Sequence, residues 1–415
     1  MKHIYLDHNA TSPASEEHLS RLFLKLKDNI ANPSSPHAKG RSASVCLTEA
    51  RRAVAKSLQV DVAEIIFLSG ATEANNLATV GVLRQNNRPL TAQRVITSAF
   101  EHPAVREPLE YLKYNEGLHL TELSVKESGY FSIKELLQNI TPETTLISLM
   151  AANNEIGTLQ PVKLIGDYLH YLRWGVVNSH TEKEFFDELS LAYLNANMTK
   201  ELLQKIHFHV DAVQCYGKLE LTDWFSPGID SCAISGHKIG SLQGVGALFL
   251  RRGRKYLPFI LGGAQEKNRR AGTENLPGII SFGMVANELY TTEWQEQKKH
   301  VIELRNFLLQ ELSAIPCIVL NTPATTILPN TVHFSLNGKG FKGEDLLVEL
   351  DIQGICASSG SACSSGANLP SKVVLALGKT PELAKNSIRL SLSHSNSLEE
   401  IKYTISIIKK YLNIC

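Results

Sequence analysis

Short apolar runs alternate with amphipathic stretches through the first 250 residues of the chain, and this alternation limits the fold more than any other feature of the sequence. Each run ends in polar or turn-forming residues. The pattern is typical of a mostly parallel sheet whose strands are connected by crossover helices. It predicts helices over residues 71–83 and 103–113 and strands over residues 64–70, 94–100, 145–151, 207–212, 230–235 and 245–250.

The pattern changes near residue 280, where a long helical apolar period begins and extends to residue 315. For a chain of 415 residues, two or three domains are the usual expectation. We predict a large α/β domain over residues 15–288 and a smaller α+β domain built from residues 1–14 and 289–415. The smaller domain is predicted to have strands at 332–336, 354–358 and 387–392 and a last helix over 397–412.

The connection before residue 207 is too long for an economical α/β chain. About thirty residues separate Tyr171 from the next strand, where a handful would suffice. Apolar residues such as Phe185, Phe186 and Leu189 indicate helix rather than loop. We interpret residues 173–205 as a helical insertion on the outside of the sheet.

The charge and the cysteine content indicate that any binding function is confined to a local site. Lys and Arg number 42 and Asp and Glu 41, so the net charge of +1 provides no field that would attract nucleic acid or an anionic membrane. The seven cysteines lack CxxC spacing, which argues against a disulfide framework and a structural zinc site. Neither a secretory signal nor a membrane span is recognisable. We expect a cytoplasmic protein without a metal site.

Polar residues follow the predicted strands at the edge where parallel sheets bind ligands. After the first strand, the turn in SGATE opens a helix and leaves backbone N–H groups beside the hydroxyl of Thr72, which together can hold a phosphate. His102 follows the second strand, and Asn153 and Asn154 follow the third. Taken singly, these residues are explained equally well as a helix cap, a surface histidine and turn formers.

The later strands place charged groups at the same edge. Asp211 follows an apolar run, where an unpaired carboxylate is costly to bury and needs a cationic partner. Ser235, His237 and Lys238 follow the next strand, and Lys238 alone would pass for a solvated surface lysine. A phosphate cup, a histidine able to stack on a ring, a carboxylate for a pyridinium nitrogen and a lysine for a Schiff base are together the parts of a pyridoxal phosphate site.

A second group of candidates lies in the smaller domain. Cys363 stands in SSGSACSSG, a run too polar and flexible for a core position, so its thiol is available as a nucleophile. Arg389 offers a bidentate fork for a carboxylate substrate, although taken alone it is more simply explained as a salt bridge. The cysteines that we expect to be buried and inert are Cys46, Cys232, Cys317 and Cys356.

These residues resemble the pyridoxal-phosphate-dependent cysteine desulfurases, which belong to the class V aminotransferases of fold type I. The motifs LDHNAT, NPSSPH, SGATEANN, EH, NNEIG, HVDAVQ, SGHK, RRAGTEN and SSGSAC occur in the family's order, interrupted mainly by residues 173–205. The loop around Cys363 resembles the group with a longer, flexible catalytic loop. The resemblance implies a large domain with a mostly parallel seven-stranded sheet and a smaller α+β domain. It also implies conversion of L-cysteine to L-alanine, with a persulfide on Cys363 for a sulfur-acceptor protein in iron–sulfur cluster assembly or a thiolation pathway.

The resemblance assigns roles residue by residue. Lys238 matches the Schiff-base lysine, Asp211 the partner of the pyridine nitrogen, and His102 the histidine stacked on the ring. Cys363 matches the sulfur-accepting cysteine and Arg389 the arginine that binds the substrate carboxylate. The further matches are Gln214 and Asn154 around the ring hydroxyl, Asn154 also at the substrate, Ala71, Thr72, Ser235 and His237 at the phosphate, and Thr273, which reaches the phosphate of the neighbouring subunit in a homodimer.

Two departures from the family pattern leave alternatives open. IGSLQGVG follows Lys238 where the family has a Gly-Pro-Lys-Gly turn, and the chain ends at Cys415 without the longer tail that holds a scaffold protein. The alternatives are a selenocysteine lyase or an aminotransferase on the same fold, or a non-catalytic adaptor. An aminotransferase would have no use for Cys363, and an adaptor would have no use for it together with Lys238, Asp211 and His102.

Overall fold

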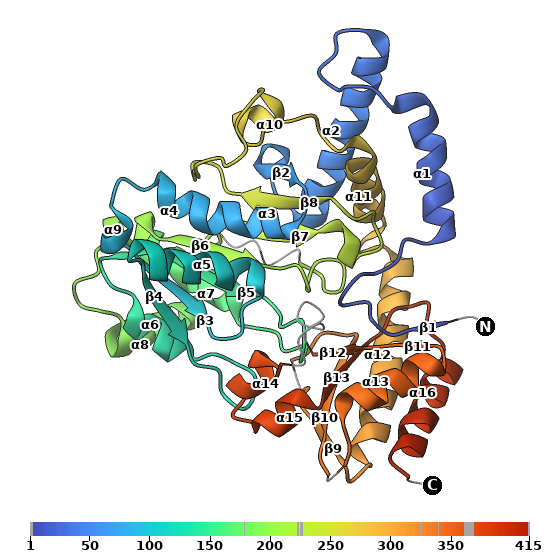
Figure 1. Ribbon diagram of the computed structural model, residues 1–415. Coiled ribbons are helices and arrows are strands. Elements are labelled where there is room, and N and C mark those ends of the chain that lie inside the picture. Colours follow the sequence, from blue (N-terminus) through green and yellow to red (C-terminus); the bar gives the residue numbers. More distant parts are fainter. Residues whose placement is uncertain are drawn as a thin grey trace.

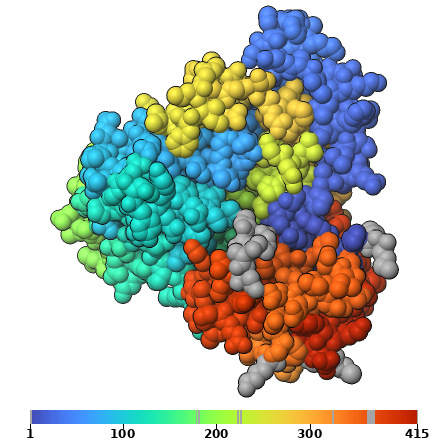
Figure 2. All heavy atoms as spheres, in the orientation of Figure 1, coloured from blue at the N-terminus to red at the C-terminus, as the bar shows by residue number. Residues whose placement is uncertain are grey.

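The computed structural model describes residues 3–177, 179–221, 224, 227–323, 326–338, 340–360 and 369–413. The chain forms a larger lobe around a long central sheet and a smaller lobe from the last third of the chain (Figure 1). Figure 2 shows the smaller lobe, in orange and red, lying against the larger one, with the N-terminal segment in dark blue beside it.

A seven-stranded sheet in the order β2-β8-β7-β6-β5-β3-β4 forms the centre of the larger lobe. Neighbouring strands are parallel except at β8, which runs antiparallel to both β2 and β7. The predicted mostly parallel sheet is therefore confirmed. Its strands are β2 (Ile65–Leu68), β3 (Arg94–Ser98), β4 (His119–Leu123), β5 (Thr144–Met150), β6 (His207–Asp211), β7 (Ser231–Ser235) and β8 (Gly246–Leu250).

The sequence pattern did not predict β4. This strand lies at the edge of the sheet beside β3, and only its last residue, Leu123, is buried. The other six strands of this sheet are buried along most of their length and therefore read as continuous apolar runs. An exposed edge strand such as HLTEL has no such run, so it gives no comparable signal.

Helices cover both faces of the sheet because successive residues of a strand point to opposite sides. In β2, Ile65 and Phe67 belong to the main core, whereas Ile66 and Leu68 pack in a second cluster on the other face. The main core includes residues of α2 (Ala38–Leu58), α6 (Ile133–Asn139), α7 (Val162–Trp174) and α11 (Leu276–Glu288). The other face carries α3 (Ala71–Asn76), the π-helical η2 (Leu77–Gly81), α4 (Val82–Gln85) and α5 (Pro103–Glu116), which confirms the two predicted helices.

The predicted insertion is helical and contains α8 (His180–Tyr193) and α9 (Lys200–Lys205). α8 lies next to α6 and α7, on the outside of the sheet. Its Phe186 is fully buried and packs on Tyr168 and Tyr171 of α7. α8 is therefore an extension of the main core rather than a loosely attached surface element.

The smaller lobe has a hydrophobic core of its own. Leu6, just after β1, is fully buried in that core, so the N-terminal segment packs with the end of the chain. This separate core supports the division into residues 15–288 and the remainder, which we retain as a prediction. The strands form two sheets, β12-β13-β10-β9 and β1-β11, from β1 (Ile4–Tyr5), β9 (Ile318–Leu320), β10 (Thr331–Leu336), β11 (Ile355–Cys356), β12 (Ser358–Ser359) and β13 (Ser387–Ser391). The helices are α12 (Thr292–Ser313), α13 (Gly343–Ile352), α14 (Lys372–Ala376), α15 (Pro381–Lys385) and α16 (Leu398–Tyr411).

The helical stretch predicted over residues 280–315 is two helices, α11 and α12. Tyr290 lies between them with a φ of 64°, a left-handed conformation that no helix continues through. α11 contributes to the main core and α12 to the core of the smaller lobe. The remaining elements are α1 (Glu16–Asn29), α10 (Gln265–Asn268) and the 3₁₀ turns η1 (Val62–Glu64), η3 (Leu90–Ala92) and η4 (Gly236–Lys238). Within the described ranges, no helix is long and apolar enough to cross a bilayer.

Candidate active site

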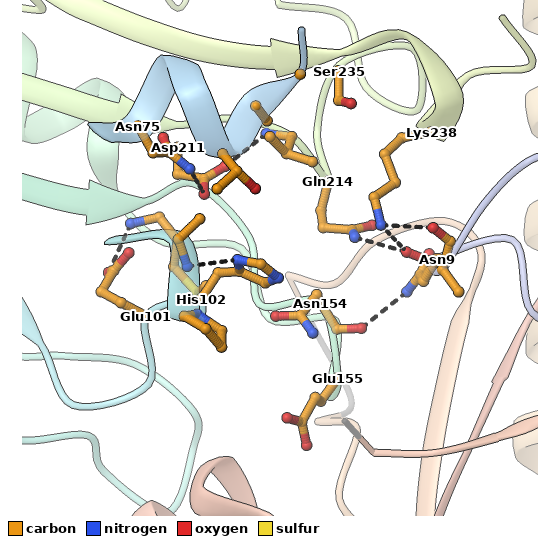
Figure 3. Close-up of a pocket in the computed structure, with 18 of the residues that line it drawn as sticks. Asn9, Asn75, Glu101, His102, Asn154, Glu155, Asp211, Gln214, Ser235 and Lys238 are labelled. Atoms are coloured by element: carbon orange, nitrogen blue, oxygen red, sulfur yellow. Dashed lines mark hydrogen bonds between the residues drawn. The ribbon is translucent and has the colours of Figure 1, made fainter. Parts of the chain in front are cut away.

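A cavity of about 840 Å³ lies where the parallel strands of the central sheet end. Its walls come from the segments after β2, β3, β5, β6 and β7, from residues 9–11, and from residues 369–373 and Arg389 of the smaller lobe. Figure 3 shows the labelled residues arranged around this space. Ten of the twelve predicted site residues line it, namely Ala71, Thr72, His102, Asn154, Asp211, Gln214, Ser235, His237, Lys238 and Arg389.

One end of the cavity has the donors that a phosphate requires. Gly70 caps the helix that begins at Ala71 without a side-chain hydrogen bond, which leaves first-turn N–H groups for a ligand. The hydroxyl of Ser235 is 1% exposed and has no hydrogen-bond partner. Ser235 pairs with Gly246 in the sheet, and a Cβ on Gly246 would stand 2.7 Å from the carbonyl carbon of Gly70. The unpartnered hydroxyl and the helix start are thus neighbours, and both fit a bound phosphate group.

His237 stands at the same end of the cavity. Its Nδ1 lies 3.0 Å from Oγ1 of Thr11, a residue that sequence reasoning did not single out. Burial, together with the charge of Lys238, lowers the pKa of His237 to about 4. The imidazole is therefore neutral near pH 7 and can contribute a ring hydrogen bond but no positive charge.

Asp211 ends β6 at the floor of the cavity. Its Oδ2 accepts a hydrogen bond from Nδ2 of Asn75 at 2.8 Å, and its Oδ1 accepts one from the backbone N–H of Val213 at 3.0 Å. Within the described ranges Asp211 forms no ion pair with a side chain, so the predicted cationic partner, a pyridinium nitrogen, stays a prediction. Two neutral donors hold the carboxylate instead, and the side facing the cavity is suited to a protonated ring nitrogen.

Lys238 reaches the cavity from η4. Its Nζ donates to the backbone oxygens of Asn9 at 2.6 Å and Ala10 at 2.9 Å. The amide of Gln214 also donates to the Asn9 oxygen, at 3.1 Å, so Lys238 and Gln214 share one anchor (Figure 3). A second lysine, Lys218, donates to Oε1 of Gln214 and Oδ1 of Asn9, each at 2.7 Å. Burial and the charge of Lys238 lower the pKa of Lys218 well below its usual range.

His102 caps α5 and faces the cavity. Its Nδ1 accepts a hydrogen bond from the N–H of Ala104 at 3.1 Å, so a proton on the neutral ring sits on Nε2. Burial lowers the pKa of His102 despite the opposing charge of Asp211, and Lys238 lowers it further. The preceding residue, Glu101, is buried with Oε1 accepting from Oγ of Ser98 and the N–H of Met150. Burial raises the pKa of Glu101 to about 8. Sequence reasoning missed this residue.

Arg389 lines the cavity from β13 and is 1% exposed. One of its terminal nitrogens forms an ion pair with Asp7 at 2.7 Å and a hydrogen bond with Oγ of Ser358, and the other donates to the backbone oxygen of Asn154 at 3.0 Å. Its Nε has no partner. The guanidinium is therefore a salt-bridge partner as well as a cavity wall, so only part of the predicted fork faces a ligand.

Two predicted residues do not join this group. Thr273 is exposed and does not line the cavity. Cys363 lies outside the described residues. Of the cysteines expected to be buried, Cys232 is, but Cys46, Cys317 and Cys356 are partly exposed. Cys46 and Cys317 are only partly buried where they pack against their hydrophobic clusters, and Cys356 is partly buried in the two-residue strand β11.

Comparison with known proteins relates this arrangement to one family. A model of the family "Aminotransferase class-V" matches residues 4–177 and 195–404. Cysteine desulfurase IscS of Dictyoglomus turgidum is 36% identical over 99% of this chain and 95% of its own length. The solved structure of a NifS-like protein superposes with a TM-score of 0.82 at 30% identity and 99% coverage of both chains. A structure titled "SspA in complex with cysteine" has a TM-score of 0.73 at 26% identity, with coverage of 95% and 100%.

Proposed function

The chain belongs to the class-V aminotransferase family and is a pyridoxal-phosphate-dependent enzyme of fold type I, and we propose that it is a cysteine desulfurase. The reaction takes the sulfur from L-cysteine and joins it to the thiol of Cys363. One C–S bond breaks, one S–S bond forms, and L-alanine leaves, so that the thiol becomes a persulfide. The relatives named as cysteine desulfurases and the neighbour solved with cysteine support this choice of substrate.

The observation that carries the proposal is the convergence of Lys238, Asp211, His102 and the phosphate donors on one cavity. These residues come from the ends of separate strands and from segments up to 167 positions apart, from Ala71 to Lys238. Each has an ordinary explanation when it is taken singly. No ordinary explanation accounts for a lysine, a buried carboxylate, a neutral histidine and an unpartnered hydroxyl around the same space.

Pyridoxal phosphate, when bound, supplies an electron sink for the substrate. Lys238 would hold it covalently, Asp211 would hold its ring nitrogen, and the N–H groups at Ala71 and Thr72 with the hydroxyl of Ser235 would hold its phosphate. The amine of Lys238 is also the base that can receive a proton from the substrate. His102, neutral with its proton on Nε2, is placed to donate a proton to the cavity.

Arg389 is proposed to bind the substrate carboxylate, together with the side chain of Asn154. Both line the cavity at its border with the smaller lobe. Because Asp7 already occupies one nitrogen of Arg389, the substrate carboxylate is expected to contact only the remaining edge of the guanidinium. Such an interaction is single rather than bidentate, which predicts a modest affinity for substrate.

We further propose a homodimer with shared active sites. Thr273 does not reach the cavity of its own chain, which is consistent with a role at the cavity of a second copy. Close to it in sequence, an exposed apolar segment offers the surface for such a contact. Its residues are Leu257, Phe259, Ile260 and Leu261. The sulfur is proposed to pass to an acceptor protein for iron–sulfur cluster assembly or thiolation, in the cytoplasm.

An assay of products tests the proposed function. The purified protein, loaded with pyridoxal phosphate, is given L-cysteine with a thiol reductant, and alanine and sulfide are measured. Equal amounts of both are expected. Formation of a keto acid instead of alanine would indicate an aminotransferase, and turnover of selenocysteine but not cysteine would indicate a selenocysteine lyase.

A further inference from the structure

Five polar side chains form a continuous buried chain beneath the floor of the cavity. It runs from His207 through Ser231, His209 and Asn75 to Asp211, across β6, β7 and α3. All five residues are buried. Of the five, the proposed mechanism uses only Asp211.

The direction of every hydrogen bond in this chain follows from the carboxylate at its end. The carboxylate only accepts, so Asn75 must turn its Nδ2 toward Asp211, at 2.8 Å. Oδ1 of Asn75 then faces Nε2 of His209 at 2.9 Å, which requires a proton on that nitrogen.

The same logic continues away from the cavity. Burial lowers the pKa of His209 to about 3, so the ring is neutral and its Nδ1 is an acceptor. The hydroxyl of Ser231 therefore donates to Nδ1, at 2.9 Å, and its oxygen accepts from Nε2 of His207 at 2.7 Å. Each donor points toward Asp211, and the four links are mutually consistent.

We propose that His209 is a positioning residue for Asp211 and acts through Asn75 at the end of this buried chain of hydrogen bonds. An asparagine amide can turn over, and the turned amide would set Oδ1 against the carboxylate. The N–H of His209 prevents this because it would then face the amide N–H₂. The carboxylate is thereby fixed on Oδ2 by Asn75 and on Oδ1 by the N–H of Val213.

This inference rests on the proposed role of Asp211 as the partner of the cofactor ring nitrogen. A carboxylate held by two donors loses little freedom when the ring binds, and this preorganisation should appear in cofactor affinity as well as in turnover. His209 touches neither the cavity nor a ligand within it. The effect of His209 on cofactor affinity must therefore disappear when Asn75 is replaced and no longer connects His209 to Asp211.

A double-mutant cycle on cofactor binding tests this requirement. The dissociation constant for pyridoxal phosphate and the visible absorbance of the bound cofactor are measured for wild type, His209→Leu, Asn75→Leu and the double variant. Each single change should weaken binding about tenfold, because one hydrogen bond to a charged group is lost or disordered. The double variant should bind no more weakly than Asn75→Leu alone. His209→Gln, which keeps a donor, should restore most of the affinity.

The matched control is Ser148→Ala. Ser148 pairs with His209 across β5 and β6, is fully buried, and its hydroxyl has no hydrogen-bond partner. The Ser148→Ala variant should bind the cofactor like wild type.

The inference is overturned if the two losses of affinity multiply in the double variant, or if folded His209→Leu binds the cofactor as tightly as wild type. If His209→Leu does not fold, His209→Gln decides: binding like wild type supports the inference, and a loss as large as that of Asn75→Leu overturns it. A wild-type protein that bound no cofactor would instead contradict the proposed function.

Discussion

Glu101 leads to a prediction whose size follows from its surroundings. Its Oε1 accepts hydrogen bonds from Ser98 at 2.5 Å and Met150 at 2.8 Å, while its Oε2 is buried without a partner. Burial raises the pKa of this carboxyl from its ordinary 4.5 to about 8, and the charge of Asp211 adds to the effect. Glu101→Gln keeps the accepting oxygen and replaces the unpartnered one by a neutral amide nitrogen.

The pH dependence of stability has a definite sign. The unfolded chain releases the Glu101 proton near pH 4.5, whereas the folded protein keeps it to about pH 8, so between these values the folded state binds more protons and rising pH destabilises it. At about 1.4 kcal/mol per pH unit, the penalty grows to roughly 5 kcal/mol at pH 8. Glu101→Gln is free of that penalty. The variant should therefore match wild type at pH 5 to within about 1 kcal/mol and exceed its free energy of unfolding by several kcal/mol at pH 8.

Urea unfolding at pH 5, 6, 7 and 8, followed by tryptophan fluorescence, measures this difference. Glu107→Gln serves as control, because Glu107 is largely exposed on α5, the helix that follows Glu101, and is hydrogen-bonded to Arg106. The difference between that variant and wild type should stay constant over this range. A constant difference for Glu101→Gln as well would refute the reasoning, since it would mean that the folded protein ionises Glu101 as readily as the unfolded chain does.

Further predictions concern the cavity and the inserted helix. After borohydride reduction, mass spectrometry should find no cofactor attached to the Lys238→Ala variant. The Lys218→Met variant should still carry the cofactor on Lys238. Attachment in Lys238→Ala would show that another lysine holds the cofactor. Asp211→Asn should fold but retain cofactor poorly and lower kcat for cysteine at least a hundredfold, because a neutral amide cannot stabilise a ring-nitrogen proton. Turnover within a few-fold of wild type would mean that Asp211 has only a structural role. Phe186→Ala should lower the free energy of unfolding by about 3–5 kcal/mol without changing cofactor affinity, since the Phe186 ring is fully buried and does not line the cavity. A loss of cofactor affinity in the folded variant would mean that α8 shapes the site.

The part of the fold that could be predicted from the sequence consists of elements whose burial gives them a distinct apolar pattern. β5 and β6 are buried along their whole length, so TLISLM and HFHVD stand out as apolar runs even with polar residues at their ends. β4 lies at the edge of the sheet, and its mixed sequence gave no such signal. The break at Tyr290 is likewise invisible in the apolar period, because α11 and α12 each keep the helical spacing on either side of it.

The predictable part of the site consists of residues placed directly after strands. Lys238, Asp211 and His102 were found because parallel strands bring their ends to one edge. The supporting residues depend on contacts that no local pattern reveals. Asn9 anchors Gln214 from 205 positions away, and Asn75 holds Asp211 from 136 positions away. Such partners become visible only when the chain is folded.

The most direct test of the central claim is the fate of sulfur in Cys363→Ala. The cofactor residues belong to the larger lobe, so the variant should fold, bind pyridoxal phosphate and show the change in visible absorbance that marks binding of L-cysteine. Without the thiol at position 363, alanine release and persulfide labelling should both collapse. Alanine and sulfide formed from L-cysteine at near the wild-type rate would contradict the account, because sulfur would then leave without passing through Cys363.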